Sequence, residues 1–378
     1  FFALNKKMSA PRPAIVTTTI FVPHALDAYF ENAVKHGYKN CLFVVTGDKK
    51  TPAEARSFCA ETAAKHGVEC IYMDCAEQDE WMKRCPELDA HLPWNCIQRR
   101  NVSILVAYEM GADPIITIDD DNFVHGDQDF IGDHIRLLGE GAAVEELRSS
   151  TGWYNICDTL EDKRGVEFYA RGYPMKQRWL EYYPVIQSSA NKRRVVVNAG
   201  LWLDDPDVDA ITRLCNDISA KKYKRDSSFT LAKGTWSPFN SQNTALARDV
   251  IEAYVLSPVV GRYDDIWASY IIDRIADHLG HAICYGFPLV KQERNPHNYF
   301  VDHDKEKDGL ELTDMLTDML KGLTVVGSSY LECFKNINAQ LHEQIAANTT
   351  LKPGHRAFLE AWMGSNDVWI ATMTRLKK

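Results

Sequence analysis

The chain has 378 residues, 45% of them hydrophobic, and a formal net charge of −9 at neutral pH. This length and apolar content are enough to bury a large core, which excludes intrinsic disorder. The acidic balance and the lack of a basic run argue against nucleic-acid or membrane binding and favour a small polar ligand. Ten cysteines without a CxxC pair indicate reduced thiols in the cytoplasm rather than disulfides or a zinc site.

From Ala14 onward, predicted strands and helices alternate. Segments of this kind at this spacing predict a right-handed, mostly parallel sheet flanked by helices, which is an α/β fold. No GxGxxG or GxxxxGK[ST] loop is present, so a dinucleotide-dependent dehydrogenase and a P-loop enzyme are disfavoured. The predicted strands are 14–20, 41–45, 68–73 and 115–118, and the predicted helices end before Gly37, before Gly67 and at Met110.

The fourth predicted strand, Ile115–Ile118, is followed directly by Asp119, Asp120 and Asp121. An apolar run that ends in acids is typical of a buried parallel strand whose carboxyl end meets solvent, the edge where α/β sheets bind ligands. Side chains alternate along a strand, so Asp119 and Asp121 should share a face, about 6.5–7 Å apart at Cα. This spacing suits Mg²⁺ or Mn²⁺ shared with a phosphate group. The alternative is a turn or a helix cap before Phe123.

Other charged residues near this strand are candidate nucleotide contacts, together with Asp119 and Asp120. Asp48 follows the second predicted strand and is placed to contact a base or ribose, although a simple turn aspartate is an equal alternative. Arg99 and Arg100 lie in the helix before the acidic strand and can pair with a pyrophosphate through their forked guanidinium groups.

Two later stretches carry candidate catalytic or binding residues. Arg171 and Arg178 lie in an aromatic-rich segment of the kind that packs against sugar faces while cations hold phosphate, although such rings also build cores. Asp264 and Asp265 precede an amphipathic helix, where one acid explains the cap and the other is available as a general base or sugar ligand. The residues do not decide which of the two acts.

Five motifs occur in the order found in a known family. With them, the chain resembles the plant reversibly glycosylated polypeptides, which include the UDP-arabinopyranose mutases, over about residues 14–296. The motifs are Ile118-Asp119-Asp120-Asp121, Arg171-Gly172-Tyr173-Pro174 with Arg178, Gly200-Leu201-Trp202-Leu203 before Pro206-Asp207, Lys233-Gly234-Thr235, and Gly261-Arg262-Tyr263-Asp264-Asp265-Ile266-Trp267-Ala268.

The resemblance implies a GT-A fold, a Rossmann-like nucleotide-sugar module, with a UDP-sugar donor and Mn²⁺ or Mg²⁺ bound through the Asp triplet. Arg171 and Trp202, both in shared motifs, are then expected among the nucleotide-sugar contacts. The arginine that becomes glycosylated in the family corresponds to Arg178, which is followed here by Trp-Leu instead of Glu-Gly. A late histidine of the family resembles a third metal ligand, for which His297 is the candidate and His303 an alternative.

We therefore expect a catalytic domain over 14–301 and a helical extension over 302–378, where apolar residues recur at helical spacing. The sequence leaves three roles open for this extension: it packs on the catalytic domain, it closes over an acceptor, or it builds a homodimer face. The predicted function is metal-dependent transfer of a sugar from a UDP-sugar to a small-molecule acceptor. The alternatives are a mutase that interconverts pyranose and furanose forms of a UDP-sugar, a self-glycosylating protein, or a non-enzymatic binding partner.

Overall fold

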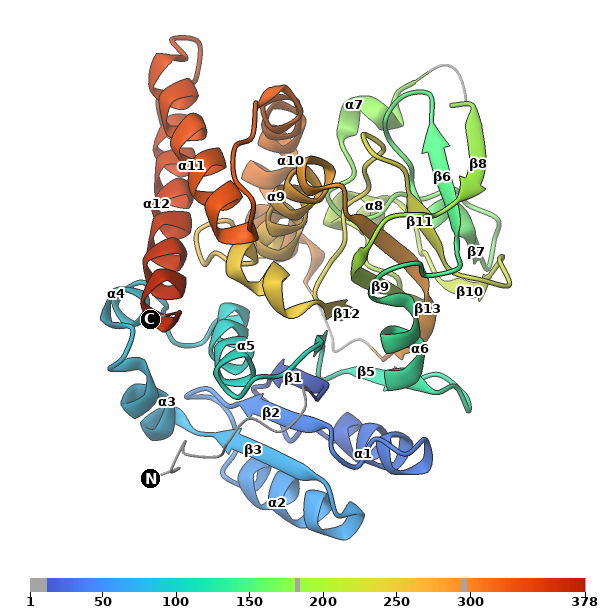
Figure 1. Ribbon diagram of the computed structural model, residues 1–378, viewed down its shortest axis with the longest axis vertical. Coiled ribbons are helices and arrows are strands. Elements are labelled where there is room, and N and C mark those ends of the chain that lie inside the picture. Colours follow the sequence, from blue (N-terminus) through green and yellow to red (C-terminus); the bar gives the residue numbers. More distant parts are fainter. Residues whose placement is uncertain (1–11, 181–183, 294–297, 378) are drawn as a thin grey trace.

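The computed structural model describes residues 12–180, 184–293 and 298–377 and begins with a parallel array of strands and helices (Figure 1). Four strands lie in the order β3-β2-β1-β4, and each neighbouring pair is parallel. Helices α1 and α2 lie on one face of these strands and α5 lies on the other (Figure 1). Each helix thereby buries its apolar side chains against the sheet. The elements of this half are β1 (Ala14–Thr18), α1 (Ala25–Lys35), β2 (Leu42–Thr46), α2 (Glu54–His66), β3 (Glu69–Met73), α3 (Cys75–Met82), α4 (Pro86–His91), η1 (Ile97–Arg99), α5 (Arg100–Glu109) and β4 (Ile115–Ile118).

The sheet then continues with strands of both directions. β12 runs antiparallel between β4 and β9, while β9 and β13 form a parallel pair, and β11, β6 and β8 complete the order. The described strands are therefore parallel in the first half and mixed in the second, because only the first half is built from strand–helix–strand units. The strands and short helices of this part are β5 (Asn122–Val124), α6 (Phe130–Leu137), β6 (Glu145–Ser149), η2 (Ile156–Thr159), β7 (Leu160–Asp162), α7 (Met175–Arg178), β8 (Ile186–Ala190), β9 (Val195–Asp204), α8 (Ala210–Cys215), β10 (Ala220–Tyr223), β11 (Phe229–Leu231), β12 (Asn243–Leu246), η3 (Arg248–Ala253), η4 (Gly261–Tyr263) and β13 (Ala282–Gln292).

Four longer helices complete the chain: α9 (Asp264–Leu279), α10 (Tyr299–Gly322), α11 (Tyr330–Ala347) and α12 (Pro353–Leu376). The last three form the expected C-terminal helical part, and they pack on the rest of the molecule. The indole N–H of Trp369 donates to the Ile251 carbonyl at 3.1 Å, and the rings of Trp267 and Trp362 meet edge to face at 4.9 Å. The expected α/β class with C-terminal helices is confirmed. The domain boundary expected at 302 falls inside α10, which is continuous there.

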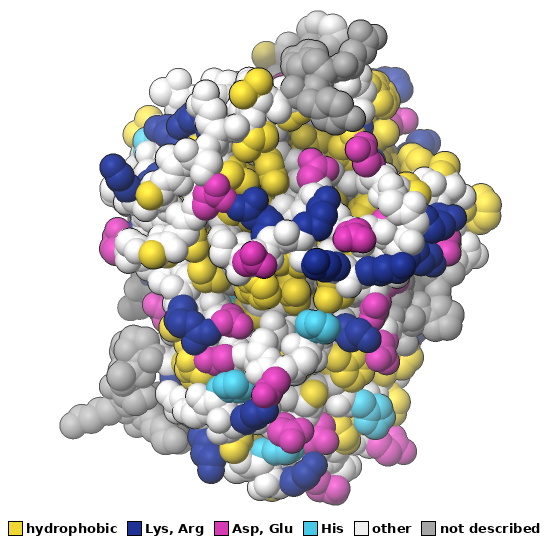
Figure 2. Space-filling view, turned by 90° about the vertical axis from the view of Figure 1, so that its right-hand side faces the viewer, with side chains coloured by type: hydrophobic (Ala, Val, Ile, Leu, Met, Phe, Trp, Pro, Cys, Tyr) yellow, Lys and Arg dark blue, Asp and Glu magenta, His cyan; other side chains and the backbone are white. Residues whose placement is uncertain are grey.

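The side of the molecule toward which β8 and β10 lie in Figure 1 bears acidic and basic side chains interspersed around an apolar centre (Figure 2). None of the described helices is long and apolar enough to cross a membrane.

β4 ends at Ile118, and Asp119 to Asp121 form the turn into β5, which pairs with β13. Phe123 lies within β5, so of the alternative expected for the three acids the helix cap is wrong, whereas the acids do form a turn. The acids stand at the carboxyl edge of the parallel strands, beside the end of β1.

Candidate functional site

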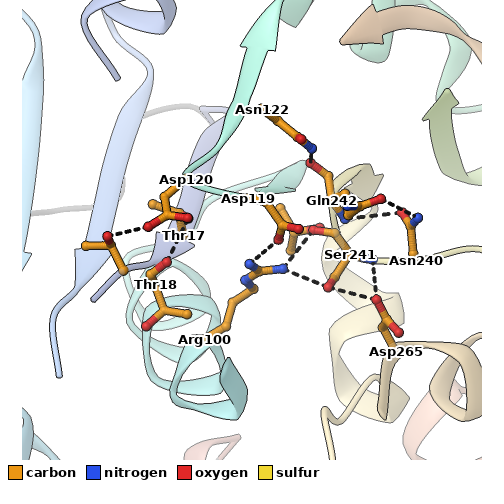
Figure 3. Close-up of polar contacts among 12 residues, drawn as sticks. Thr17, Thr18, Arg100, Asp119, Asp120, Asn122, Asn240, Ser241, Gln242 and Asp265 are labelled. Atoms are coloured by element: carbon orange, nitrogen blue, oxygen red, sulfur yellow. Dashed lines mark hydrogen bonds and ion pairs between the residues drawn. The ribbon is translucent and has the colours of Figure 1, made fainter. Parts of the chain in front are cut away.

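Asp119 and Asp120, the first two acids after β4, point in opposite directions (Figure 3). The Asp119 carboxylate contacts the guanidinium group of Arg100, whereas Asp120 accepts a hydrogen bond from the Thr19 hydroxyl at the end of β1 (Figure 3). Burial raises the pKa of Asp120, and the charge of Asp119 raises it further. Asp120 therefore ties the β4 end to the β1 end, while Asp119 faces the opposite way.

Asp119 and Asp121 act on a common neighbour, the buried hydroxyl of Tyr29. The pKa of Tyr29 is raised by burial first and then by the charges of these two carboxylates. Two hard carboxylates fit Mn²⁺ or Mg²⁺ when a diphosphate and water complete the coordination shell. Within the described ranges, no group of three or more His, Cys, Asp or Glu side chains is placed to hold a metal ion. His297, the expected third ligand, lies outside the described residues.

Behind Asp119 lies a chain of buried polar contacts (Figure 3). Arg100, with only 1% of its side chain exposed, contacts Asp119 and also donates to the Ser241 carbonyl at 3.0 Å and to the Ser241 hydroxyl at 2.7 Å. Asp265 accepts from the Ser241 backbone N–H at 2.9 Å and from its hydroxyl at 3.1 Å. Burial alone would lower the pKa of Arg100, but the charges of Asp119 and Asp265 raise it above its usual value. Residues from α5, β4, α9 and the segment before β12 thus meet at one place.

Arg171 connects a further carboxylate, that of Asp207, to these buried polar contacts. Its guanidinium group donates to both oxygens of Asp207, each at 2.8 Å, and to Asp265 at 3.1 Å. It also contacts the Arg262 carbonyl. Burial would lower the pKa of Arg171, but Asp207 and Asp265 hold it well above the usual value. Arg171 is buried in the protein, where it neutralises two carboxylates.

Asp264 and Asp265, the two candidate bases, have different surroundings. Asp264 accepts a hydrogen bond from the Gln98 amide at 2.8 Å, and burial, together with the charge of Asp265, raises its pKa to about 7. Asp265 is engaged by both Arg171 and Ser241. Neither acid is the N-cap of α9, which is Tyr263, and among the described residues no side chain caps the first turn of this helix. The structure thus gives one acid that can hold a proton near neutral pH and one that is held by cations and hydrogen-bond donors.

Asp48 and Arg99 occupy structural positions beside the ligand edge. Asp48 accepts from the backbone N–H groups of Lys49, Asn95 and Cys96 at 2.6, 2.8 and 3.2 Å, so it closes a loop. Arg99 is buried, lies 3.6 Å from the ring centre of Trp94, and donates to the Gln78 side chain at 3.0 Å. Burial lowers its pKa. Of the two neighbouring arginines, only Arg100 contacts the acidic turn.

Arg178 and Trp202, taken from the shared motifs, are both largely buried. Arg178 donates to the fully buried Asp209 at 2.6 Å and to the carbonyls of Tyr173 and Ala170 at 3.2 and 3.4 Å. The Trp202 ring, 2% exposed, lines a small cavity beside Arg171, and its N–H has no hydrogen-bond partner among the described residues. Neither side chain is presented to solvent in this conformation.

Sequence reasoning missed the polar residues that join these acids and arginines. Thr19, Ser241 and Asp209 were not assigned a role, and Asp207 entered only as part of a motif. One signal was present: the segment 237–244 is polar and almost free of charge, yet it lies between apolar residues. All of its polar side chains are buried here, as Ser237, Asn240, Ser241, Gln242, Asn243 and Thr244. A run of this composition indicates a buried hydrogen-bond network.

Comparison with known proteins places these motifs in a family context. The family model described as "Reversibly glycosylated polypeptide" matches residues 100–369. UDP-arabinopyranose mutase 3 of Arabidopsis thaliana is 29% identical over 261 residues, which are 66% of this chain and 67% of the relative. Probable UDP-arabinopyranose mutase 1 of Solanum tuberosum is 31% identical over 261 residues, again 66% and 67%. A mannosyltransferase of Pyrobaculum calidifontis, solved with GDP-Man and Mn²⁺, has a TM-score of 0.38 and 10% identity, covering 99% of this chain and 78% of that one.

These findings correct the function predicted from the sequence. Sugar transfer to a small-molecule acceptor was the main expectation, because a metal and a UDP-sugar at the edge of a GT-A sheet suit a transferase. The matched relatives are instead named as mutases, whose reaction is intramolecular. The transferase prediction is therefore wrong, and its mutase alternative agrees better with the relatives.

Proposed function

Because this chain belongs to the reversibly glycosylated polypeptide family, we propose that it is a mutase that interconverts the pyranose and furanose forms of a UDP-sugar. The observation that carries the proposal is the match of the chain to this family and to relatives named as mutases, and the matched region includes the acidic turn Asp119–Asp121 at the ligand edge of the sheet. UDP-arabinopyranose is the first substrate to test, since the relatives are named for it. The free thiols of all ten cysteines support a cytoplasmic location.

Ring contraction of a UDP-pentopyranose changes the oxygen that closes the ring. The bond between C1 and O5 is replaced by a bond between C1 and O4, and the proton of the O4 hydroxyl ends on O5. The enzyme therefore needs groups that hold the diphosphate, so that the sugar is kept in place, and a group that accepts and returns a proton. No redox partner and no external acceptor are required.

The residues at the site support these two tasks. Asp119 and Asp121 would hold Mn²⁺ or Mg²⁺, which when bound supplies positive charge against the diphosphate. We assign the proton to Asp264 rather than to Asp265, because the pKa of Asp264 is raised to about 7 by burial. A carboxyl group with this pKa can both donate and accept near neutral pH. Asp265 is unsuitable, since its oxygens already accept hydrogen bonds from Arg171 and Ser241.

The test is incubation of the purified protein with UDP-arabinopyranose and Mn²⁺, without an acceptor. We expect UDP-arabinofuranose, separated by anion-exchange chromatography and identified by nuclear magnetic resonance. Asp121→Asn should abolish the product and weaken UDP binding in calorimetry by about tenfold or more, because one of the two proposed cation ligands loses its charge. Asp277→Asn is a matched control: it changes a carboxylate in α9 that accepts from Gly234 and Trp236, away from the acidic turn.

Two outcomes would count against the proposal. Hydrolysis to UDP and free arabinose without any furanose product would indicate a nucleotide-sugar hydrolase instead. Equal turnover by wild type and Asp121→Asn would remove the acidic turn from the reaction. A chelator separates the metal assignment from the mutase assignment. If the metal assignment is correct, UDP binding is lost when divalent cations are removed and returns when Mn²⁺ is added back. The mutase assignment is tested by the furanose product alone.

A further inference from the structure

Three buried residues connect α9 to the Asp119 carboxylate at the ligand edge. Arg100 is 1% exposed, Asp265 is 4% exposed and Ser241 is 5% exposed, whereas the Asp119 side chain is 24% exposed. In this series of contacts, Asp119–Arg100–Ser241–Asp265, only Asp119 therefore meets solvent. Asp265 lies at the interior end of the series (Figure 3).

The direction of each hydrogen bond in this chain is fixed by chemistry. An arginine can only donate and an ionised carboxylate can only accept, so the Ser241 hydroxyl must donate to Asp265 and accept from Arg100. Asp265 also holds the Ser241 backbone N–H at 2.9 Å. Loss of the Asp265 charge would leave Ser241 without its strongest acceptor and leave Arg100 with Asp119 as its one remaining counter-charge in the chain.

The charges of the buried chain alternate in sign. Arg100 lies between Asp119 and Asp265, and Arg171 lies between Asp265 and Asp207. Asp265 is thus the carboxylate shared by the two buried arginines. A buried ion pair is strongly destabilised when one partner is removed, because the other charge stays desolvated. The positions of both guanidinium groups consequently depend on Asp265.

We infer that Asp265 is a positioning residue that fixes the Asp119 carboxylate through Ser241 and Arg100. The inference rests on the proposed function in one respect: the ligand of Asp119 is taken to be the diphosphate of a UDP-sugar with its cation. It assigns to Asp265 a role different from that of a general base: Asp265 does not touch the substrate, and it sets the orientation of a group that does.

The experiment compares wild type, Asp265→Asn and Ser241→Ala by titration with UDP in the presence of Mn²⁺. For Asp265→Asn we expect UDP affinity to fall by about tenfold, the effect of losing a charge-assisted hydrogen bond that orders a ligand group. Ser241→Ala keeps every charge and both backbone groups, so it should lower the affinity in the same direction by a smaller factor, about threefold. Asp277→Asn, the matched change in α9, should bind UDP like wild type.

A crystal structure of Asp265→Asn without nucleotide provides a readout that does not depend on the reaction. We expect the Arg100 guanidinium group to move from Ser241 toward Asp119, its remaining counter-charge, and the Asp119 side chain to change its rotamer. An Arg100 guanidinium group and an Asp119 side chain that both keep their wild-type positions in that crystal, or wild-type UDP affinity in both variants, would overturn the inference while leaving the mutase proposal intact. Conversely, a displaced Asp119 in a protein that shows no ring contraction would support the inference and count against the mutase. If Asp265→Asn does not fold, the crystal of Ser241→Ala decides the question by the same criterion.

Discussion

Replacing Arg178 by alanine tests whether this arginine anchors the protein or is presented for glycosylation. Its side chain donates to Asp209, which is fully buried, at 2.6 Å. Removing one partner of a buried ion pair costs about 3–5 kcal/mol, and the lower end applies because Asp209 keeps its cap bonds to Thr212. An unfolding entropy of about 2.1 cal/mol/K per residue gives about 0.8 kcal/mol/K for 378 residues. We therefore expect Arg178→Ala to lower the melting temperature by about 4 °C in scanning calorimetry.

Arg178→Lys is the matched control, since it retains the positive charge beside Asp209 but loses the forked geometry. It should lose less stability than Arg178→Ala. Both variants are then incubated with UDP-arabinopyranose and weighed by intact-mass spectrometry. The anchoring argument would be refuted if Arg178→Ala melted at the same temperature as the wild type. If, in addition, only the wild type gained the mass of a sugar, Arg178 would be identified as the modified residue.

Three further changes test other parts of the structure. The pKa of Asp264 is about 7 in the folded protein and near 4 in an unfolded chain, so stability is lost as pH rises from about 4 to about 7. In Asp264→Asn the melting temperature should change less between about pH 4 and about pH 7 than in the wild type. An equal fall in both proteins would contradict the raised pKa of Asp264. Gly172 has φ +79°, and a Cβ there would lie 2.2 Å from Ile266 Cγ2. Gly172→Ala should therefore cost about 2–4 kcal/mol in urea unfolding, and less in an Ile266→Ala background. Trp202→Phe removes an indole N–H that has no partner among the described residues. Its stability should stay within about 1 kcal/mol of wild type, and a large loss of UDP affinity would show that the ring serves the ligand.

The reaction was mispredicted for a reason that lies in the site itself. A cation-binding turn at a sheet edge serves any enzyme that handles a nucleotide-sugar, whether the sugar moves to another molecule or closes a different ring. The residues of the Asp119–Asp121 turn carry no information about the acceptor oxygen. The relatives supplied that information, since the matched proteins are named for an intramolecular reaction.

Arg99 and Arg100 show how local patterns leave a choice open. Either of them was a candidate to pair with pyrophosphate, and because neighbouring residues in a helix point about 100° apart, two adjacent arginines cannot face the same ligand equally. The structure turns Arg99 toward Trp94 and Gln78, and Arg100 toward Asp119. Helical periodicity alone could not select between them, because both flanks of α5 are buried.

The sequence by itself determined the four parallel strands of the N-terminal half with helices α1, α2 and α5, the end of β4 at the three acids, and helices α11 and α12, but not α3, α4 or α10. These features follow from apolar periodicity and from charges at the end of a buried run, both of which are local. The tertiary structure alone decided which charges meet. Asp119, Ser241 and Asp265 come together because β12 inserts beside β4 and α9 begins next to it, and the high cost of an isolated buried charge then fixes their partners.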